Sequence, residues 1–242
     1  MLADTLKSIA GQRLVDTDGE VTHLELLPPA TDQQIRDLEA KLPGPLPDEI
    51  RAALAVTTGF ANGPLESFAL LHLEGFGLDE VFPHPYSIAH DGFGNYWILD
   101  VLPGATDWGP VFYACHDPAV IAYQASSIEQ FVKDIVAVPP DDARSPINHV
   151  HETVVHALWS NHSALVDQRT GAASPDVTLR EFAEYLPPDA VIADLRDPRP
   201  GSGFAWGMYG PKTNIQRFGT HRLWALTRPP AKPGFFARLF GR

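Results

Sequence analysis

The spacing of apolar side chains predicts an amphipathic helix early in the chain. Ile35, Leu38 and Leu42 recur every three or four residues and would face a core. Thr31 stands where an N-cap is needed, and Gln34 can complete a capping box with it. Three prolines shortly afterwards end this helix.

A second helix and three strands are predicted to follow. The helix runs from about Pro47 to a stop at Gly59, with its inward positions at Ile50, Leu54 and Ala55. The strands are short apolar or aromatic runs between turn residues, at 68–73, 96–101 and 111–114. The last two should lie side by side as antiparallel neighbours joined by a loop.

A third helix is expected at 128–136, behind a cap at Ser126 or Ser127. Helices and strands in this order predict an α+β fold with a mainly antiparallel sheet flanked by helices. Residues 1–30 show only a weak alternation of apolar and polar positions. We therefore expect a short strand pair or a loosely docked arm there.

A smaller α+β unit is predicted in the second half of the chain. The stretch 139–146 is rich in proline and charge, as linkers between domains are. Helical spacing continues from 147 to about 165 and resumes at Thr178, and strand candidates follow at 191–195, 204–209 and 222–227. The predicted parts are domains at 1–138 and 147–230 and a basic amphipathic tail at 231–242. The tail is too short for a stable isolated helix, so stable membrane insertion is not expected.

Charge is distributed unevenly along the chain, whose net charge is −12. Residues 1–140 contain twenty acidic and six basic residues, whereas the remainder contains ten acidic and twelve basic ones. An acidic domain repels nucleic acid and attracts basic partners. The same charge would also serve solubility alone, and both interpretations stay open.

Composition favours a cytoplasmic protein. No run of ~18 apolar residues could span a membrane, and the first residues lack the apolar core of a signal peptide. The single cysteine, Cys115, cannot form an internal disulfide and lies in an apolar strand candidate. We expect a buried, inert thiol in a reducing compartment.

Several turn and packing residues carry a family resemblance. They are Leu46, Pro47 and Ile50; Asp91, Gly92, Gly94, Asn95 and Leu99; Gly109, Pro110, Val111 and Asp117; and Ser127, Glu129 and Phe131. Asp-Gly and Gly-Asn are turn dipeptides that can begin a hairpin. Over about residues 31–136 this pattern resembles the SMI1/KNR4 (SUKH) family.

The resemblance implies a non-catalytic protein-binding module without a cofactor. Members of this kind include bacterial immunity proteins, which bind and mask a toxin, often a nuclease. It points to partner-binding residues on the sheet face and its loops: Tyr96, Trp97, Asp100, Asp107, Trp108, Tyr113 and Asp117. Aromatic side chains would supply contact area, and the carboxylates would attract a basic toxin domain. Because strand residues alternate in direction, about half of the aromatics should be core, with only one of Tyr96 and Trp97 exposed.

Two other functions remain as alternatives. The chain could be a regulatory or scaffolding protein with a host partner, or a hydrolase that uses His90 or His116 beside Asp91 or Asp117. No nucleophile elbow or phosphate-binding glycine loop accompanies these histidines. We therefore assign no catalytic residue.

The other motifs give neither a metal site nor a nucleic-acid site. His151 and His156 are five residues apart, which places them about 140° apart on an α-helix, whereas zincins need a spacing of four. Arg217, Arg222 and Trp224 form a basic, aromatic group that could bind single strands. Docking of this group onto the acidic first domain is the preferred interpretation.

Overall fold

The computed structural model describes residues 1–15, 21–63, 65, 67–73, 77–137 and 145–229. Most of the expected linker and the whole expected tail lie outside these residues. The helices are α1 (Leu2–Ile9), α2 (Asp32–Glu39), α3 (Asp48–Leu54), α4 (Ile128–Val136), α5 (Pro146–Asn148), the π-helix η2 (His149–Val154), α6 (Val155–Ser160), α7 (Gln168–Ala172) and α8 (Val177–Glu184).

The strands form three antiparallel sheets. They are β1 (Arg13–Val15), β2 (Val21–His23), β3 (Glu25–Leu26), β4 (Gly59–Ala61), β5 (Ser67–Leu73), β6 (Pro85–His90), β7 (Tyr96–Asp100), β8 (Val111–His116), β9 (Ala119–Ala125), β10 (Val166–Asp167), β11 (Val191–Asp194), β12 (Gly203–Phe204), β13 (Asn214–Arg217) and β14 (Leu223–Thr227).

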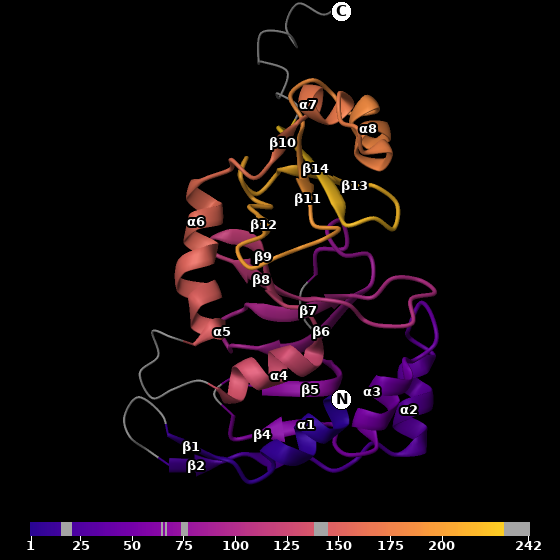
Figure 1. Ribbon diagram of the computed structural model, residues 1–242, viewed down its shortest axis with the longest axis vertical. Coiled ribbons are helices and arrows are strands. Elements are labelled where there is room, and N and C mark those ends of the chain that lie inside the picture. The colour runs from indigo at the N-terminus through magenta and orange to yellow at the C-terminus, as the bar shows by residue number, and fades with distance from the viewer. Residues whose placement is uncertain (16–20, 64, 66, 74–76, 138–144, 230–242) are drawn as a thin grey trace, which may run out of the picture.

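The largest sheet forms the centre of the molecule (Figure 1), with the strand order β12-β9-β8-β7-β6-β5-β4-β3. The order β10-β11-β14-β13 gives the smaller C-terminal region its own sheet, and β1 pairs with β2 alone. The structure thus confirms an α+β fold with a mainly antiparallel sheet flanked by helices, followed by a smaller α+β region.

The N-terminus differs from the sequence prediction. The expected strand pair is present, as β1 and β2, but a buried helix precedes it where we expected at most an arm. Leu2, Leu6 and Ile9 of α1 face the core at helical spacing, and α1 packs against α3 and α4. The Thr5 hydroxyl donates a hydrogen bond to Glu129 of α4 (3.1 Å). The helix has only eight residues and no side-chain N-cap, so its sequence signal was weak.

The predicted cap of α2 is confirmed. The Thr31 hydroxyl accepts from the Gln34 backbone N–H (3.3 Å), and the Gln34 side chain accepts from the Thr31 N–H (2.9 Å). The second helix, α3, ends earlier than expected, at Leu54. The prediction that Ala55 faces inward is therefore wrong, and Ala53 takes this place in the core.

The predicted pairing of residues 96–101 with 111–114 is confirmed, since β7 and β8 are antiparallel with Trp97 opposite Tyr113. Two strands that were not predicted, β6 and β9, pair on either side of these two. The strand predicted at 204–209 is shorter than expected. Only Gly203 and Phe204 pair with β9, and a Cβ on Gly203 would come within 2.2 Å of the Ile121 carbonyl oxygen.

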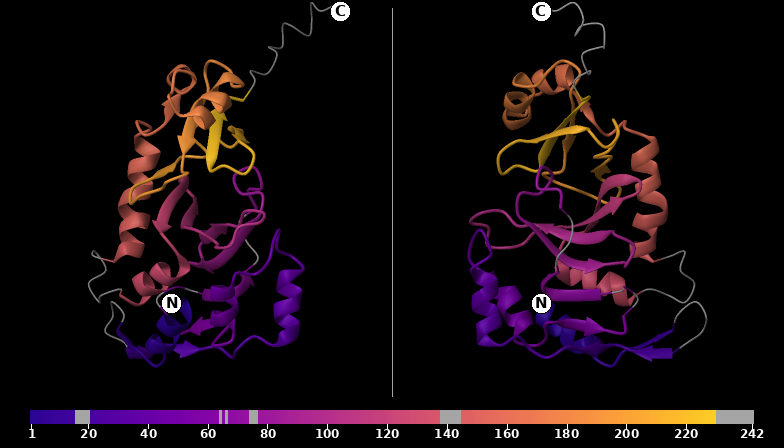
Figure 2. Two further views of the ribbon diagram at one scale, coloured as in Figure 1. Left: turned by 45° about the vertical axis from the view of Figure 1, so that its right-hand side comes forward. Right: turned by 180° about the vertical axis from the view of Figure 1, so that it is seen from behind.

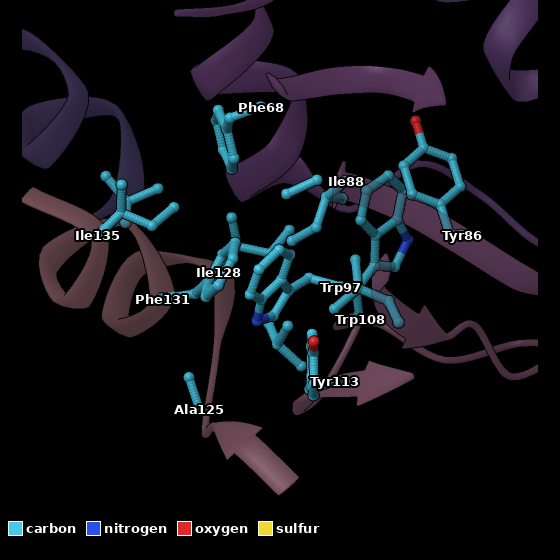
Figure 3. Packing of buried hydrophobic residues seen from close by; sticks show 14 of the residues in the cluster. Phe68, Tyr86, Ile88, Trp97, Trp108, Tyr113, Ala125, Ile128, Phe131 and Ile135 are labelled. Atoms are coloured by element: carbon cyan, nitrogen blue, oxygen red, sulfur yellow. The ribbon is translucent and has the colours of Figure 1, made fainter. Parts of the chain in front are cut away.

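Both faces of the central strands are buried. On one face Trp97 and Leu99 of β7 belong to the core formed with α1, α3 and α4, shown close up in Figure 3. On the other face Ile98 packs in a second core with Trp224 and Leu226 of β14. The C-terminal sheet lies over this second face at one end of the molecule (Figure 2). Side chains of β7 that would be solvent-exposed in a one-sided sheet are therefore enclosed.

A buried ion cluster joins the two sheets. Asp100, at the end of β7, is 1% exposed and receives two hydrogen bonds of 2.7 Å from Arg217. Arg222 donates a third, of 3.0 Å, to the same carboxylate. Arg217 also lies over the Trp224 ring at 5.2 Å. The expected docking of this basic group onto the acidic first part is thus present, through Asp100 itself.

We expect Asp100→Asn to reduce the free energy of unfolding by about 3–5 kcal/mol. Among the described residues Asp100 is the one carboxylate that pairs with these two enclosed guanidinium groups, and unpaired buried charges carry a large desolvation cost. Urea denaturation monitored by tryptophan fluorescence gives this value.

Asp107→Asn is the matched control, because Asp107 is exposed on the loop after the same strand. It should change stability by less than about 0.5 kcal/mol. Equal stabilities of the two variants would show that the cluster does not hold the sheets together.

Candidate protein-binding site at the turn end of the sheet

The seven residues predicted to bind a partner do not form one surface. Trp97, Asp100, Trp108 and Tyr113 are buried, Tyr96 is half-buried, and Asp107 and Asp117 are exposed. Asp107 follows β7 and Asp117 follows β8, and these strands run antiparallel. The two exposed carboxylates therefore lie at opposite ends of the sheet.

The buried members of this set serve packing. The Trp97 ring lies 4.9 Å from that of Tyr113 and 5.7 Å from that of Phe131 in the core shown in Figure 3. Its indole N–H donates to the Gln124 side chain (3.0 Å). Trp108 packs against Tyr86 at 4.5 Å. More of these aromatics are core than the expected half, since three of the four are buried, and of Tyr96 and Trp97 only Tyr96 is partly accessible.

A tight turn at residues 91–95 joins β6 to β7 and is held by one carboxylate. Asp91 accepts hydrogen bonds from the Phe93 N–H (2.8 Å), the Asn95 N–H (3.2 Å) and the Asn95 side-chain amide (2.6 Å). Gly92 and Gly94 adopt φ of 77° and 90°, which other residues rarely do. Phe93 between them projects outward and is 82% exposed.

The neighbouring turn, between β8 and β9, is fixed to the first one. The Asn95 side-chain oxygen accepts from the His116 backbone N–H (3.1 Å), and the His116 imidazole contacts the same oxygen at 3.0 Å. Asp117 follows and is exposed. We call this surface, made of Asp91, Phe93, His116 and Asp117, the turn end. It presents one aromatic side chain beside two carboxylates on a rigid support.

A cavity of about 230 Å³ opens beside Phe93. The described residues that line it are Leu65, Asp91, Phe93, Trp97, Tyr113, Ile147, Asn148 and His151. The Tyr113 hydroxyl is buried without a hydrogen-bond partner among the described residues. Burial raises the pKa of Tyr113 well above its usual range, and Cys115 and Asp91 nearby raise it further.

Next to α5, the π-helix η2 contributes His151 to the lining of this cavity. Its wider turn places His151 against Tyr113, with the ring centroids 5.7 Å apart and the rings nearly perpendicular. Short π-helical segments often occur at functional sites, because the inserted residue re-aims its neighbours. The apolar positions in residues 149–154 follow ordinary helical spacing, so this change could not be predicted from the sequence.

The histidines do not assemble a catalytic or metal site in the part of the chain that the structure describes. His90 accepts from the Gly92 N–H (3.2 Å) and His116 contacts the Asn95 side-chain oxygen (3.0 Å), so these contacts of both imidazoles are to residues of the 91–95 turn. His149, His151 and His156 are exposed on successive helical segments. No three His, Cys, Asp or Glu side chains lie close enough together to hold a metal ion there.

Sequence reasoning overlooked Phe93, although a signal was present. Two glycines that need positive φ flank this residue, so it cannot continue either strand. An apolar side chain at the tip of such a turn cannot reach the sheet core and must face solvent. Cys115, by contrast, is buried as expected, and burial raises the pKa of its thiol.

We expect Tyr113→Phe to be at least as stable as the native chain at pH 7. The change removes a buried hydroxyl that has no partner, at no cost in packing. Above pH about 10 the unfolded chain loses the tyrosine proton while the folded chain retains it, so ionisation lowers the stability of the native chain. The variant should lack this contribution, about 1.4 kcal/mol per pH unit.

Urea denaturation at pH 7 and at two values above pH 10 tests this expectation. A variant less stable than the native chain by more than about 1 kcal/mol at pH 7 would show that the hydroxyl has a partner after all.

Comparison with known proteins identifies the first part of the chain. Residues 29–134, a little under half of its length, match the model of the SMI1 / KNR4 family (SUKH-1). No curated protein and no solved structure gives a significant match. Among the described residues no helix is long and apolar enough to cross a membrane. Over residues 29–134, from just before α2 to within α4, the chain therefore carries a domain of the SMI1/KNR4 (SUKH-1) family.

Proposed function

We propose that this chain is a cytoplasmic, non-catalytic protein-binding module that neutralises a toxic partner by binding to it. The family match supports a protein-binding role of the immunity type. The observation that carries the proposal in this molecule is the turn end, where Phe93 is 82% exposed on a turn that Asp91 holds rigidly. Rigid, exposed aromatic side chains are characteristic anchors of protein interfaces.

Electrostatics favours a basic partner. The part of the chain up to residue 140 has twenty acidic and six basic residues, and Asp117 lies exposed at the same end of the sheet as Phe93. Such a field accelerates encounter with a positively charged protein and opposes nucleic acid. A toxin domain that binds nucleic acid would itself be basic, which suits this surface.

The central face of the sheet is a poorer candidate for partner binding. Ile98 and Phe112 on that face are fully buried under the C-terminal sheet. Of the residues that the family resemblance pointed to, Asp117 and half-buried Tyr96 remain accessible at the end of the sheet near Phe93. Asp107 is accessible only at the opposite end.

A regulatory protein with a host partner is the second candidate function. The same surface would serve it, because exposure of Phe93 does not specify which protein covers it. Affinity capture of the tagged full chain from its own cells, at low and high salt, separates the two. A stoichiometric, salt-sensitive, basic partner with a toxic domain supports neutralisation, and an endogenous housekeeping partner supports regulation.

Survival is the decisive test of neutralisation. Cells that express the captured toxic domain should grow only when this chain is co-expressed. Continued growth arrest despite a folded, expressed chain would refute toxin neutralisation.

We expect Phe93→Ala to weaken binding of the captured partner at least about tenfold, which corresponds to ~1.4 kcal/mol, without altering stability. Phe93 makes almost no contact with its own fold, so its loss affects only the interface. Tyr185→Ala is the matched control, since Tyr185 is 81% exposed but lies at the end of α8 in the C-terminal region. Isothermal titration calorimetry on both variants measures the effect, and equal affinities would exclude the turn end.

A further inference from the structure

The cavity beside Phe93 has the composition of a cation site. Asp91 is the one acidic residue among the described residues that line it, and no lysine or arginine is among them. Three of the lining side chains are the aromatic rings of Phe93, Trp97 and Tyr113. A carboxylate beside aromatic faces attracts a positive group by charge and by cation–π interaction.

The carboxylate in the cavity has acceptor capacity left. Asp91 uses three acceptor positions within its own turn, and a carboxylate offers about four. Glu152, which contacts His151 at 3.2 Å, adds negative charge beside the cavity. A ligand rich in donors would use the acceptor position that Asp91 leaves open.

The size of the cavity suits a side chain. Its volume of about 230 Å³ would hold roughly seven waters at ~30 Å³ each. Trp97 and Tyr113 are almost fully buried and Phe93 is exposed, so the two buried rings form the floor of the cavity and Phe93 lies at its rim. A planar group that carries several N–H donors could pack against the Phe93 ring and reach Asp91.

We propose that this cavity receives the guanidinium group of an arginine side chain of a basic protein partner. The inference rests on the proposed function, because it names the chemistry by which that partner would be held. Phe93 covers the aliphatic stem at the entrance, and Asp91 receives the guanidinium.

The test uses N-acetyl-arginine amide as a probe on the full chain. The indole N–H of Trp97, held by Gln124, reports on the cavity in a ¹⁵N–¹H NMR spectrum. The arginine probe should shift this signal saturably. The citrulline analogue has the same shape without the charge and should bind at least about tenfold more weakly, because charge-assisted hydrogen bonds are lost.

Asp91→Asn is the decisive variant. An asparagine oxygen can still accept the two turn N–H groups, so the turn should fold, while the charge and the acceptor for the Asn95 side-chain amide are lost. We expect the arginine probe to lose at least about tenfold in affinity. Asp189→Asn, an exposed acid in the C-terminal region, changes the net charge equally and should leave the affinity unchanged.

The outcomes separate this inference from the proposed function. No saturable shift up to about 50 mM probe, or equal binding by the Asp91 and Asp189 variants, overturns the arginine site. If binding of the captured partner still depended on Phe93, the proposed protein-binding function would remain supported. Binding of the free probe with no captured protein partner would show a small cationic ligand instead, and would overturn the assignment to a partner side chain.

Discussion

The arrangement of this molecule depends on one enclosed carboxylate. Asp100 ends a central strand of the SMI1/KNR4 domain and binds two arginines from the C-terminal region. A buried charge is costly unless its partners of opposite charge are held close to it, so this contact constrains where the second sheet lies. The packing of Ile98 and Phe112 against Trp224 and the enclosure of both sheet faces follow from that position.

The parts of the fold that local chemistry determines could be predicted from the sequence. The Thr31 capping box, the pairing of β7 with β8 and the burial of Cys115 depend on residues close in the chain or on simple alternation. Helix α1 was missed because its stability comes from contacts with α3 and α4 rather than from its own sequence.

The candidate site was harder to predict for a related reason. The residue type of an aromatic or acidic position on a strand does not show whether that face of the sheet is exposed or covered by another part of the chain. Asp100 and Trp108 were selected as surface groups, but sequence-distant partners enclose them. Phe93 could have been found, because its flanking glycines fix its exposure locally. The cavity behind it could not, since η2 and β8 meet only in three dimensions.

The pairing of β12 with β9 limits where the chain can be truncated. The segment that matches the family ends within α4, yet the sheet is completed by Gly203 and Phe204 from far along the chain. A fragment cut at the family boundary would leave β9 as an open edge strand, with the apolar side chains of Ile98, Phe112 and Ile121 facing water. Such an edge invites other chains to add to it, so the excised domain would be prone to aggregate, although its own family signature is intact.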